Sequence, residues 1–146
     1  MRITQEADYA LRIVYLLAKR GGILDAATIS SESGVTERFT VKILRKLMSE
    51  GIVGSKMGAR GGYSLAAKPD DVSMQRVIEA IDGPVEISRC LDSDYECTRM
   101  GDKKIECAFH LIFAKINKSV ADKMSTVTFD TVTNDDFDVR KLLENL

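Results

Sequence analysis

Apolar residues near the start of the chain recur at three- and four-residue intervals, which is the period of an α-helix. These positions are Tyr9, Ile13, Leu16 and Leu17, with Ala10 and Val14 beside them. The spacing predicts a helix over residues 5–19, and Thr4 before it is a suitable N-cap. Gly21 and Gly22 follow, as glycines commonly do at helix C-termini. We therefore expect the chain to open with an amphipathic helix that buries one face.

Two more helices are predicted over residues 25–50. Asp25 is expected to cap a short helix that runs through Ser33, and Thr36 to cap a longer one that ends at Glu50. The expected buried stripe of the longer helix consists of Ile43, Leu44, Leu47 and Met48. A short helix, a turn with glycine and a longer amphipathic helix are typical of a helix-turn-helix, whose second helix reads DNA. The alternative is a helical hairpin with a solvated basic face.

A β-hairpin is predicted directly after these helices. Residues 51–55 and 63–66 have the character of short strands, and residues 56–62 between them are rich in glycine. A hairpin in this place is the wing of a winged helix-turn-helix. Because Lys56 and Arg60 lie in its tip, we expect the wing to contact DNA, with a plain tight turn as the alternative.

The second half of the chain changes from helix to polar loop and back to helix. Residues 73–81 predict another amphipathic helix, whereas residues 92–106 hold too few apolar side chains to fix their shape by burial. A helix is predicted again from Cys107 to Met124, with an apolar stripe formed by Phe109, Ile112, Phe113, Ile116 and Val120. Little chain is left to cover this stripe, so we expect a second copy to do so. The alternative is that this helix folds back on its own winged helix.

The net charge of −1 conceals a basic segment. Between Thr36 and Tyr63 six basic residues face only Glu37 and Glu50, which leaves a local balance of +4. Such a patch on a nearly neutral protein indicates binding to phosphates, and double-stranded operator DNA is the expected partner. The residues expected at the DNA interface are Arg2, Thr36, Glu37, Arg38, Phe39, Thr40, Lys42, Lys56, Arg60, Gly61 and Gly62.

All three cysteines and the only histidine fall in one segment, at Cys90, Cys97, Cys107 and His110. Three thiolates and an imidazole supply the ligands of a tetrahedral zinc or of an iron–sulfur cluster. The first two gaps are longer than the roughly two to four residues between ligands in zinc ribbons, which favours a cluster. A zinc-stabilised constitutive DNA-binding repressor and a metal-free thiol-based redox sensor are the alternatives.

The order of these motifs resembles the IscR/NsrR-type family of winged-helix iron–sulfur transcriptional regulators. The matching segments are Met1-Arg2-Ile3-Thr4 with Asp8-Tyr9-Ala10, Arg60-Gly61-Gly62-Tyr63-Ser64-Leu65, Val77-Ile78-Glu79-Ala80-Ile81-Asp82-Gly83-Pro84, and Arg89-Cys90 with the later cysteines. The resemblance implies a homodimer that binds near-palindromic operators, with an iron–sulfur cluster held by the three loop cysteines.

The resemblance offers two candidates for the fourth ligand. IscR-like members use a histidine three residues after the last cysteine, which His110 matches, and the implied cluster is 2Fe-2S. NsrR-like members use an acid in the first helix of the partner subunit, which Asp8 matches, and the implied cluster is 4Fe-4S and senses nitric oxide. We rank His110 above Asp8, so 2Fe-2S is favoured. The expected signal is redox state, iron or cluster supply, or nitric oxide.

The predicted fold class is therefore mainly α with a small β-hairpin wing: a winged helix-turn-helix plus a long dimerisation helix. We expect a DNA-binding domain over residues 1–83, a cluster-binding loop over 84–106, a dimerisation helix and closing segment over 107–133, and an acidic, mobile tail over 134–146.

Catalysis and membrane anchoring find little support in the sequence. One histidine, no recognisable pair of carboxylates and no phosphate-binding loop leave few groups for catalysis, so we expect no enzyme. The N-terminus has no basic-then-apolar leader, and no apolar run approaches the roughly 18 residues that span a bilayer. We therefore expect a cytoplasmic protein.

Overall fold

The computed structural model describes residues 2–146, without the side chains of Asp102, Lys104 and Asn145. Met1, which opens the predicted DNA-binding domain, lies outside these residues. The helices and strands are α1 (Gln5–Arg20), α2 (Ala26–Ser33), α3 (Glu37–Ser49), β1 (Val53–Lys56), β2 (Gly62–Leu65), α4 (Met74–Asp82), α5 (Ala108–Thr126), α6 (Phe129–Thr133) and α7 (Val139–Asn145). Short 3-10 turns cover Pro69–Asp71, Arg89–Leu91 and Gly101–Glu106. The predicted mainly α fold with a two-stranded wing is confirmed.

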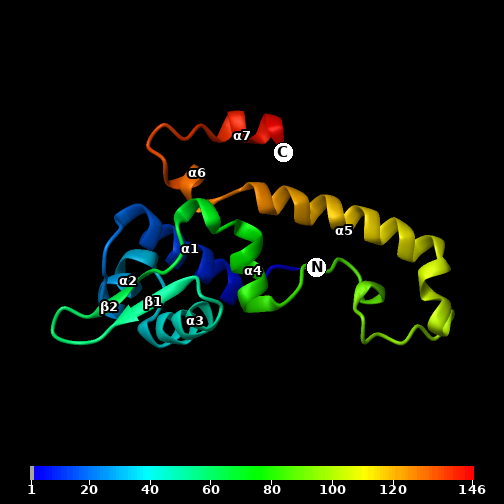
Figure 1. Ribbon diagram of the computed structural model, residues 1–146, viewed down its shortest axis with the longest axis horizontal. Helices are drawn as coiled ribbons and strands as arrows, with labels where there is room; N and C mark the ends of the chain where they lie inside the picture. Colours follow the sequence, from blue (N-terminus) through cyan, green and yellow to red (C-terminus); the bar gives the residue numbers. More distant parts are fainter. Residues whose placement is uncertain (1) are drawn as a thin grey trace.

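The winged helix forms one end of the molecule, and α5 reaches away from it toward a loop at the opposite end (Figure 1). The loop leaves the C-terminal end of α4, and α5 then returns the chain toward the winged helix. Along its way back α5 packs against α4 and against the loop. In the described part of the chain, no helix has both the length and the hydropathy needed to cross a bilayer.

Polar side chains fix where several helices begin. Thr4, Asp25 and Ser73 each accept a backbone N–H from the first turn of α1, α2 and α4, as N-caps do. Thr36 occupies the N-cap position of α3, but its side chain makes no capping hydrogen bond. Thr4 also donates its backbone N–H and its hydroxyl to the Asp82 carboxylate, at 3.1 and 2.6 Å. This pair of bonds fastens the start of α1 to the end of α4.

A single core lies beneath α1, α2, α3, α4 and the wing. Its buried members include Ala10, Ile13, Val14, Leu17, Ile29, Val35, Ile43, Leu44, Leu47, Ile52, Val53, Val72, Val77 and Phe129. The prediction for Met48 is wrong, because its side chain remains 36% exposed. The buried face of α3 runs from Thr40 to Leu47, and Met48 lies at the edge of that face. Thr40 is fully buried instead and donates its hydroxyl to the Val35 carbonyl at 3.3 Å.

The segment after α5 pairs with the segment before α4. Met74 donates its backbone N–H to the Val127 carbonyl at 2.8 Å, and Phe129 donates to the Val72 carbonyl at 2.9 Å. The Phe129 side chain enters the core and is 4% exposed. The closing segment therefore completes the winged helix, although it follows the long excursion through the loop and α5.

The C-terminal residues form α7, for which the sequence predicted no helix. The stretch just before α7 is fastened to α1 by Lys19, whose ammonium pairs with the Asp135 carboxylate. The same ammonium donates to the Thr133 carbonyl at 3.1 Å. α7 itself carries exposed apolar side chains at Val139 and Leu143.

Candidate nucleic-acid interface and cysteine loop

The outer side of α3 presents a cationic face, formed by Arg38, Phe39, Lys42 and Arg45. All four side chains are exposed and line one open hollow together with Val41. Among the residues that the structure describes, no carboxylate lies within 4 Å of Arg38 or Arg45. Their guanidinium groups therefore point at solvent without an acidic partner, as side chains that bind DNA phosphates or bases do.

The remaining predicted DNA contacts, apart from Thr40, fall into two groups. Arg2, Thr36, Glu37, Lys56 and Arg60 are exposed. Gly61 and Gly62 are half-buried.

Thr40 does not share the cationic face, although it was predicted to contact DNA. Its side chain lies on the buried face of α3 and is 0% exposed, and its hydroxyl donates a hydrogen bond to the Val35 carbonyl. A buried side chain cannot reach a base edge, so the prediction for Thr40 is corrected. The helical period explains the error, because position 40 belongs to the buried face of α3.

An acidic residue that is not among the predicted DNA contacts lies beside the cationic face. Glu6, in the first turn of α1, pairs with Lys42 at 3.0 Å and with Lys46 at 2.9 Å. Its side chain is 20% exposed. Burial alone raises the pKa of Glu6, but hydrogen bonds from Lys46 and Lys42 outweigh burial and hold the pKa below its usual value. Glu6 is therefore charged at neutral pH.

An aromatic contact also joins α1 to the cationic face. The rings of Tyr9 and Phe39 meet edge to face, with their centroids 6.2 Å apart. The Lys42 ammonium lies 5.9 Å from the centroid of the Phe39 ring. α1 thus determines where Phe39 and Lys42 stand on the surface.

Two wing glycines are required by the hairpin itself. A Cβ on Gly61 would lie 2.4 Å from the Lys56 carbonyl oxygen, and one on Gly62 would lie 2.4 Å from the Leu24 carbonyl oxygen. Gly62 also has a positive φ of +154°. Next to it, Tyr63 exchanges two backbone hydrogen bonds with Leu24, at 2.8 and 2.9 Å. These glycines let the wing fold tightly and project Lys56 and Arg60 outward.

The cysteine loop, residues 84–107, runs from the end of α4 to the end of α5 that is farthest from the winged helix (Figure 1). Cys90, Cys97 and Cys107 are partly exposed and form no disulfide. Among the described residues, no three His, Cys, Asp or Glu side chains come together closely enough to hold a metal ion. The structure thus places the three cysteines on this loop and His110 in the first turn of α5, without joining the described side chains into a single site.

Contacts with α5 hold the first part of the cysteine loop. His110 Nδ1 lies 2.9 Å from the Cys90 carbonyl oxygen. Asn117 donates its amide to the Val85 carbonyl at 2.8 Å and accepts the Ile87 N–H at 2.9 Å. Two of the four predicted ligands, Cys90 and His110, are therefore neighbours.

Cys107 occupies the N-cap position of α5. The backbone N–H of His110, and then that of Phe109, point at its sulfur and lower the pKa of the thiol. Burial opposes this shift, and the charge of Arg99 adds to it. The lowered pKa increases the fraction of Cys107 present as thiolate, which is the form that binds metals and reacts with oxidants.

Asp8, the other candidate fourth ligand, lies on α1 and is far in sequence from the loop. Its carboxylate pairs with Arg12 at 2.6 Å, and half of the side chain is exposed. In the described chain Asp8 is thus held by a cation of its own helix. To bind a cluster of the partner subunit, the Asp8 carboxylate would have to break its ion pair with Arg12.

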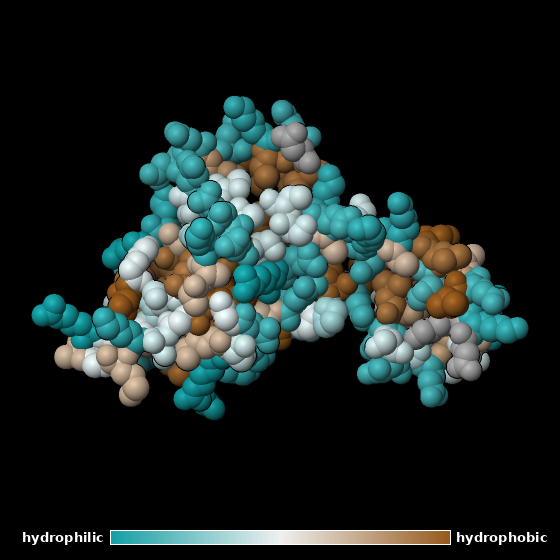
Figure 2. Space-filling view, in the orientation of Figure 1, coloured by the Kyte–Doolittle hydropathy of each residue, from teal (hydrophilic) through white to brown (hydrophobic). Residues whose placement is uncertain are grey.

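The apolar stripe of α5 is only partly covered: Phe113 and Val120 are half-buried, and the other three residues are exposed. Phe109, Ile112 and Ile116 are 62%, 53% and 47% exposed. Hydrophobic side chains gather on the surface around the far end of α5 (Figure 2). α5 does pack against α4 of its own winged helix, but this contact leaves Phe109, Ile112 and Ile116 exposed.

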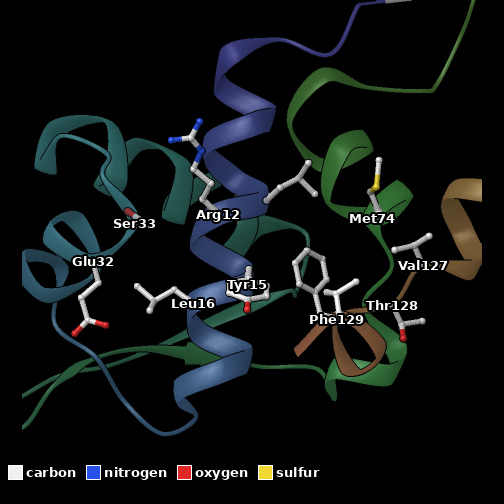
Figure 3. A pocket seen from close by; sticks show the side chains of 11 residues that line it. Arg12, Tyr15, Leu16, Glu32, Ser33, Met74, Val127, Thr128 and Phe129 are labelled. Atoms are coloured by element: carbon white, nitrogen blue, oxygen red, sulfur yellow. The ribbon is translucent and has the colours of Figure 1, made fainter. Parts of the chain in front are cut away.

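An apolar hollow of about 490 Å³ opens between α1, α4 and the link from α5 to α6. Its lining residues are Leu11, Arg12, Tyr15, Leu16, Glu32, Ser33, Met74, Val127, Thr128, Phe129 and Val132. Figure 3 shows Tyr15 of α1 next to Phe129, whereas Leu16 points to the other side, toward Glu32. The molecule thus carries both an apolar stripe and an apolar recess.

Comparison with known proteins identifies the family. Residues 3–135 match the model of the Rrf2 family, described as an iron-dependent transcriptional regulator. A putative HTH-type transcriptional regulator, rrf2-like, from Rhodobacter capsulatus is 32% identical over 98% of this chain and 99% of its own length. The HTH-type transcriptional regulator IscR of Pectobacterium atrosepticum is 26% identical over 92% of this chain and 80% of its own length.

A solved structure agrees with the fold. CymR, the global cysteine regulator of B. subtilis, superposes with a TM-score of 0.73 at 23% identity, over 91% of this chain and 96% of its own. The resemblance to IscR-type regulators and the expectation of no enzyme are both confirmed by these matches. The chain belongs to the Rrf2 family of DNA-binding transcriptional regulators.

Proposed function

We propose that this protein is a dimeric transcriptional regulator whose affinity for its operator is controlled by an iron–sulfur cluster. The observation that carries the proposal is the combination, in one short chain, of a cationic face on α3 with a separate loop of three cysteines, next to which the only histidine lies in the first turn of α5. The first feature reads DNA, and the second supplies ligands for an inorganic group.

DNA recognition is assigned to α3 and the wing. Arg38, Lys42 and Arg45 of α3 enter the major groove, and Lys56 and Arg60 of the wing reach the backbone and the minor groove. Replacing Arg60 by Ala should weaken operator binding strongly and leave the visible absorption of the cluster intact. Unchanged binding would remove the wing from the interface.

The cluster is assigned to Cys90, Cys97, Cys107 and His110. Support comes from the donor set, from the lowered pKa of Cys107 and from the contact between His110 and Cys90. When bound, the cluster would supply a centre that responds to oxidation, to iron supply or to nitric oxide. A 2Fe-2S cluster suits this set, whereas a 4Fe-4S cluster with Asp8 of the partner subunit as fourth ligand is the alternative.

The dimer is assigned to the exposed stripe of α5, which a second copy would bury. A twofold dimer places two copies of α3 on successive half-sites of a near-palindromic operator. Because the cysteine loop is bound to α5 through His110 and Asn117, its conformation bears directly on the helix that joins the two copies. The state of the loop thereby sets the angle between the two winged helices.

The deciding experiment is purification without oxygen, followed by measurement of the absorption spectrum, iron and acid-labile sulfide. A coloured protein with iron and sulfide supports the cluster. The variant Cys97→Ala should lose the colour and keep the secondary structure and the dimer. If it unfolds, the metal has a structural role instead.

A thiol-based sensor is the second candidate, because Cys107 is partly exposed and its pKa is lowered. In that case the purified protein would contain no metal, and oxidant would change its DNA affinity in the wild type but not in Cys107→Ser. Zinc in a colourless protein whose DNA binding ignores oxidant would indicate the constitutive repressor.

A further inference from the structure

Glu6 is an acid placed beside a surface that the proposed function uses to bind a polyanion. Its two carboxylate oxygens take one lysine each, Oε2 pairing with Lys42 at 3.0 Å and Oε1 with Lys46 at 2.9 Å. Both lysines belong to α3, whereas Glu6 belongs to α1. Lys46 also lies near the Ile81 carbonyl, at 3.4 Å. The two lysines of α3 and the acid that pairs with both of them therefore come from different elements.

The exposures show which partner is accessible to DNA. The Lys42 side chain is 56% exposed and the Lys46 side chain 38%, whereas the Glu6 side chain is only 20% exposed. A phosphate can thus reach the lysines from solvent, but the carboxylate cannot swing away into solvent without leaving both of them. A phosphate oxygen bound to Lys42 at about 3 Å would lie within about 6 Å of the Glu6 carboxylate, where like charges repel.

We propose that Glu6 is a built-in competitor of DNA phosphate for Lys42 and Lys46, and that it weakens binding to DNA of arbitrary sequence. This inference rests on the proposed use of α3 as the recognition helix. Affinity for arbitrary DNA comes from phosphate contacts and their released counterions. Two lysines engaged by Glu6 contribute less to that affinity than Arg38 and Arg45, which have no carboxylate within 4 Å in the described chain. Glu6 thereby limits the time that the regulator spends on the wrong DNA.

The test measures fluorescence anisotropy of a labelled 24-base-pair duplex of mixed sequence at several KCl concentrations. Glu6→Gln should bind this duplex about 3- to 10-fold more tightly than the wild type at ~100 mM KCl, with a log–log salt slope steeper by about one to two. Glu6→Asp retains the charge and should bind like the wild type. Thermal melting of each variant shows that the fold is retained.

Glu32→Gln is the matched control. Glu32 also pairs with a cation of another element, Arg20 at 3.1 Å, and its replacement changes the net charge equally. Glu32 lies on α2 and lines the apolar hollow rather than the cationic face. The affinity of Glu32→Gln for the duplex should therefore equal that of the wild type. In a Lys42→Met, Lys46→Met background, Glu6→Gln should give no gain.

Each outcome has a definite meaning. The inference is overturned if Glu6→Gln binds no better than the wild type, if Glu32→Gln gains as much, or if the gain survives without the two lysines. Weaker binding by Glu6→Gln would show that Glu6 only positions the lysines. A wild-type protein that binds no duplex at any salt concentration would instead refute the DNA-binding assignment of α3.

Discussion

Single atoms decide whether the wing can form. The missing Cβ of Gly61 leaves room for the Lys56 carbonyl, and no flexible side chain could yield there, because the contact is with backbone. Gly61→Ala should therefore distort the wing and reduce DNA affinity by roughly 10-fold or more, through lost phosphate contacts. Operator binding measured by anisotropy tests this expectation.

Gly54→Ala is the control for that substitution. Gly54 lies in β1, its φ is not positive, and an added Cβ would make only an ordinary contact of 3.7 Å with Ala66. Its DNA affinity should remain at the wild-type level. Equal losses in both variants would contradict a specific requirement for glycine at position 61.

Asp25 gives the stability of α2 a pH dependence. Its carboxylate accepts the Thr28 N–H at 2.8 Å and the Thr28 hydroxyl at 3.0 Å, and these bonds lower the pKa of Asp25. When folding lowers the pKa of a carboxyl group, the ionised group stabilises the folded state. This stabilisation is complete at pH values above the pKa in the unfolded chain, about 3.9 for Asp, and it is lost as the pH falls through the pKa in the folded protein. Asp25→Ala should therefore reduce the free energy of unfolding at pH 7 and reduce it less at low pH.

Urea unfolding of the wild type and Asp25→Ala between about pH 2 and 7 measures this difference. Asp25→Asn retains a capping side chain but has no titrating group. The difference in free energy of unfolding between Asp25→Asn and Asp25→Ala should therefore depend much less on pH. A difference between wild type and Asp25→Ala that does not shrink in acid would contradict the assignment.

At the residue level the sequence predicted the caps and the buried faces better than the surface contacts. Thr4 and Asp25 cap helices through bonds within a few residues, so their roles are visible in local sequence. The pairing of Glu6 with Lys42 and Lys46 crosses from α1 to α3, and no local pattern encodes it. Thr40 was misassigned because a polar residue on an otherwise apolar face looks like a surface residue.

At the level of elements, α5 is the helix whose environment is least complete. Three of its stripe residues are exposed, and we expect Phe109→Asp to separate the proposed dimer, because a charge would be buried against the apolar surface of the second copy. The dissociation constant should rise by roughly 100-fold or more. Sedimentation velocity at micromolar concentration measures the change.

Leu143→Asp is the matched control for Phe109→Asp. Leu143 is 63% exposed, almost the same as Phe109 at 62%, but it lies on α7. The control variant should remain dimeric. Dissociation of both variants, or of neither, would contradict the assignment of the dimer interface to α5.

The sequence predicted α5 almost to its ends, since its stripe follows the helical period. It did not predict the pairing of the segment after α5 with the segment before α4, because strand-like pairing between residues so far apart leaves no periodic signal. Nor did the spacing of the cysteines determine how their side chains are arranged. A polar loop takes its shape from partners on α5, such as Asn117, rather than from its own composition.

In the whole molecule, the cysteine loop and α5 form one excursion of the chain, residues 83–126. It leaves the winged helix at the C-terminal end of α4 and rejoins it at the N-terminal end of α4. The excursion departs after Asp82, and it returns at Val127, whose carbonyl accepts the Met74 N–H. A nine-residue helix such as α4 is about 13 Å long, a span that about six flexible residues can bridge.

A chain in which residues 86–125 are replaced by about six Gly and Ser residues should therefore fold as a winged helix. We expect cooperative thermal melting, a monomer in sedimentation, and weak binding to a single half-site. Non-cooperative melting would show that the winged helix needs the cysteine loop and α5 in order to fold.

The tie between Val127 and Met74 also bears on how such regulators diversify. Because both ends of the excursion rest on one helix, a lineage can lengthen it, shorten it or change its ligands while the register of the DNA-reading part stays as it is. The proposed sensing loop and the DNA-binding part can then evolve at different rates within a single uninterrupted chain.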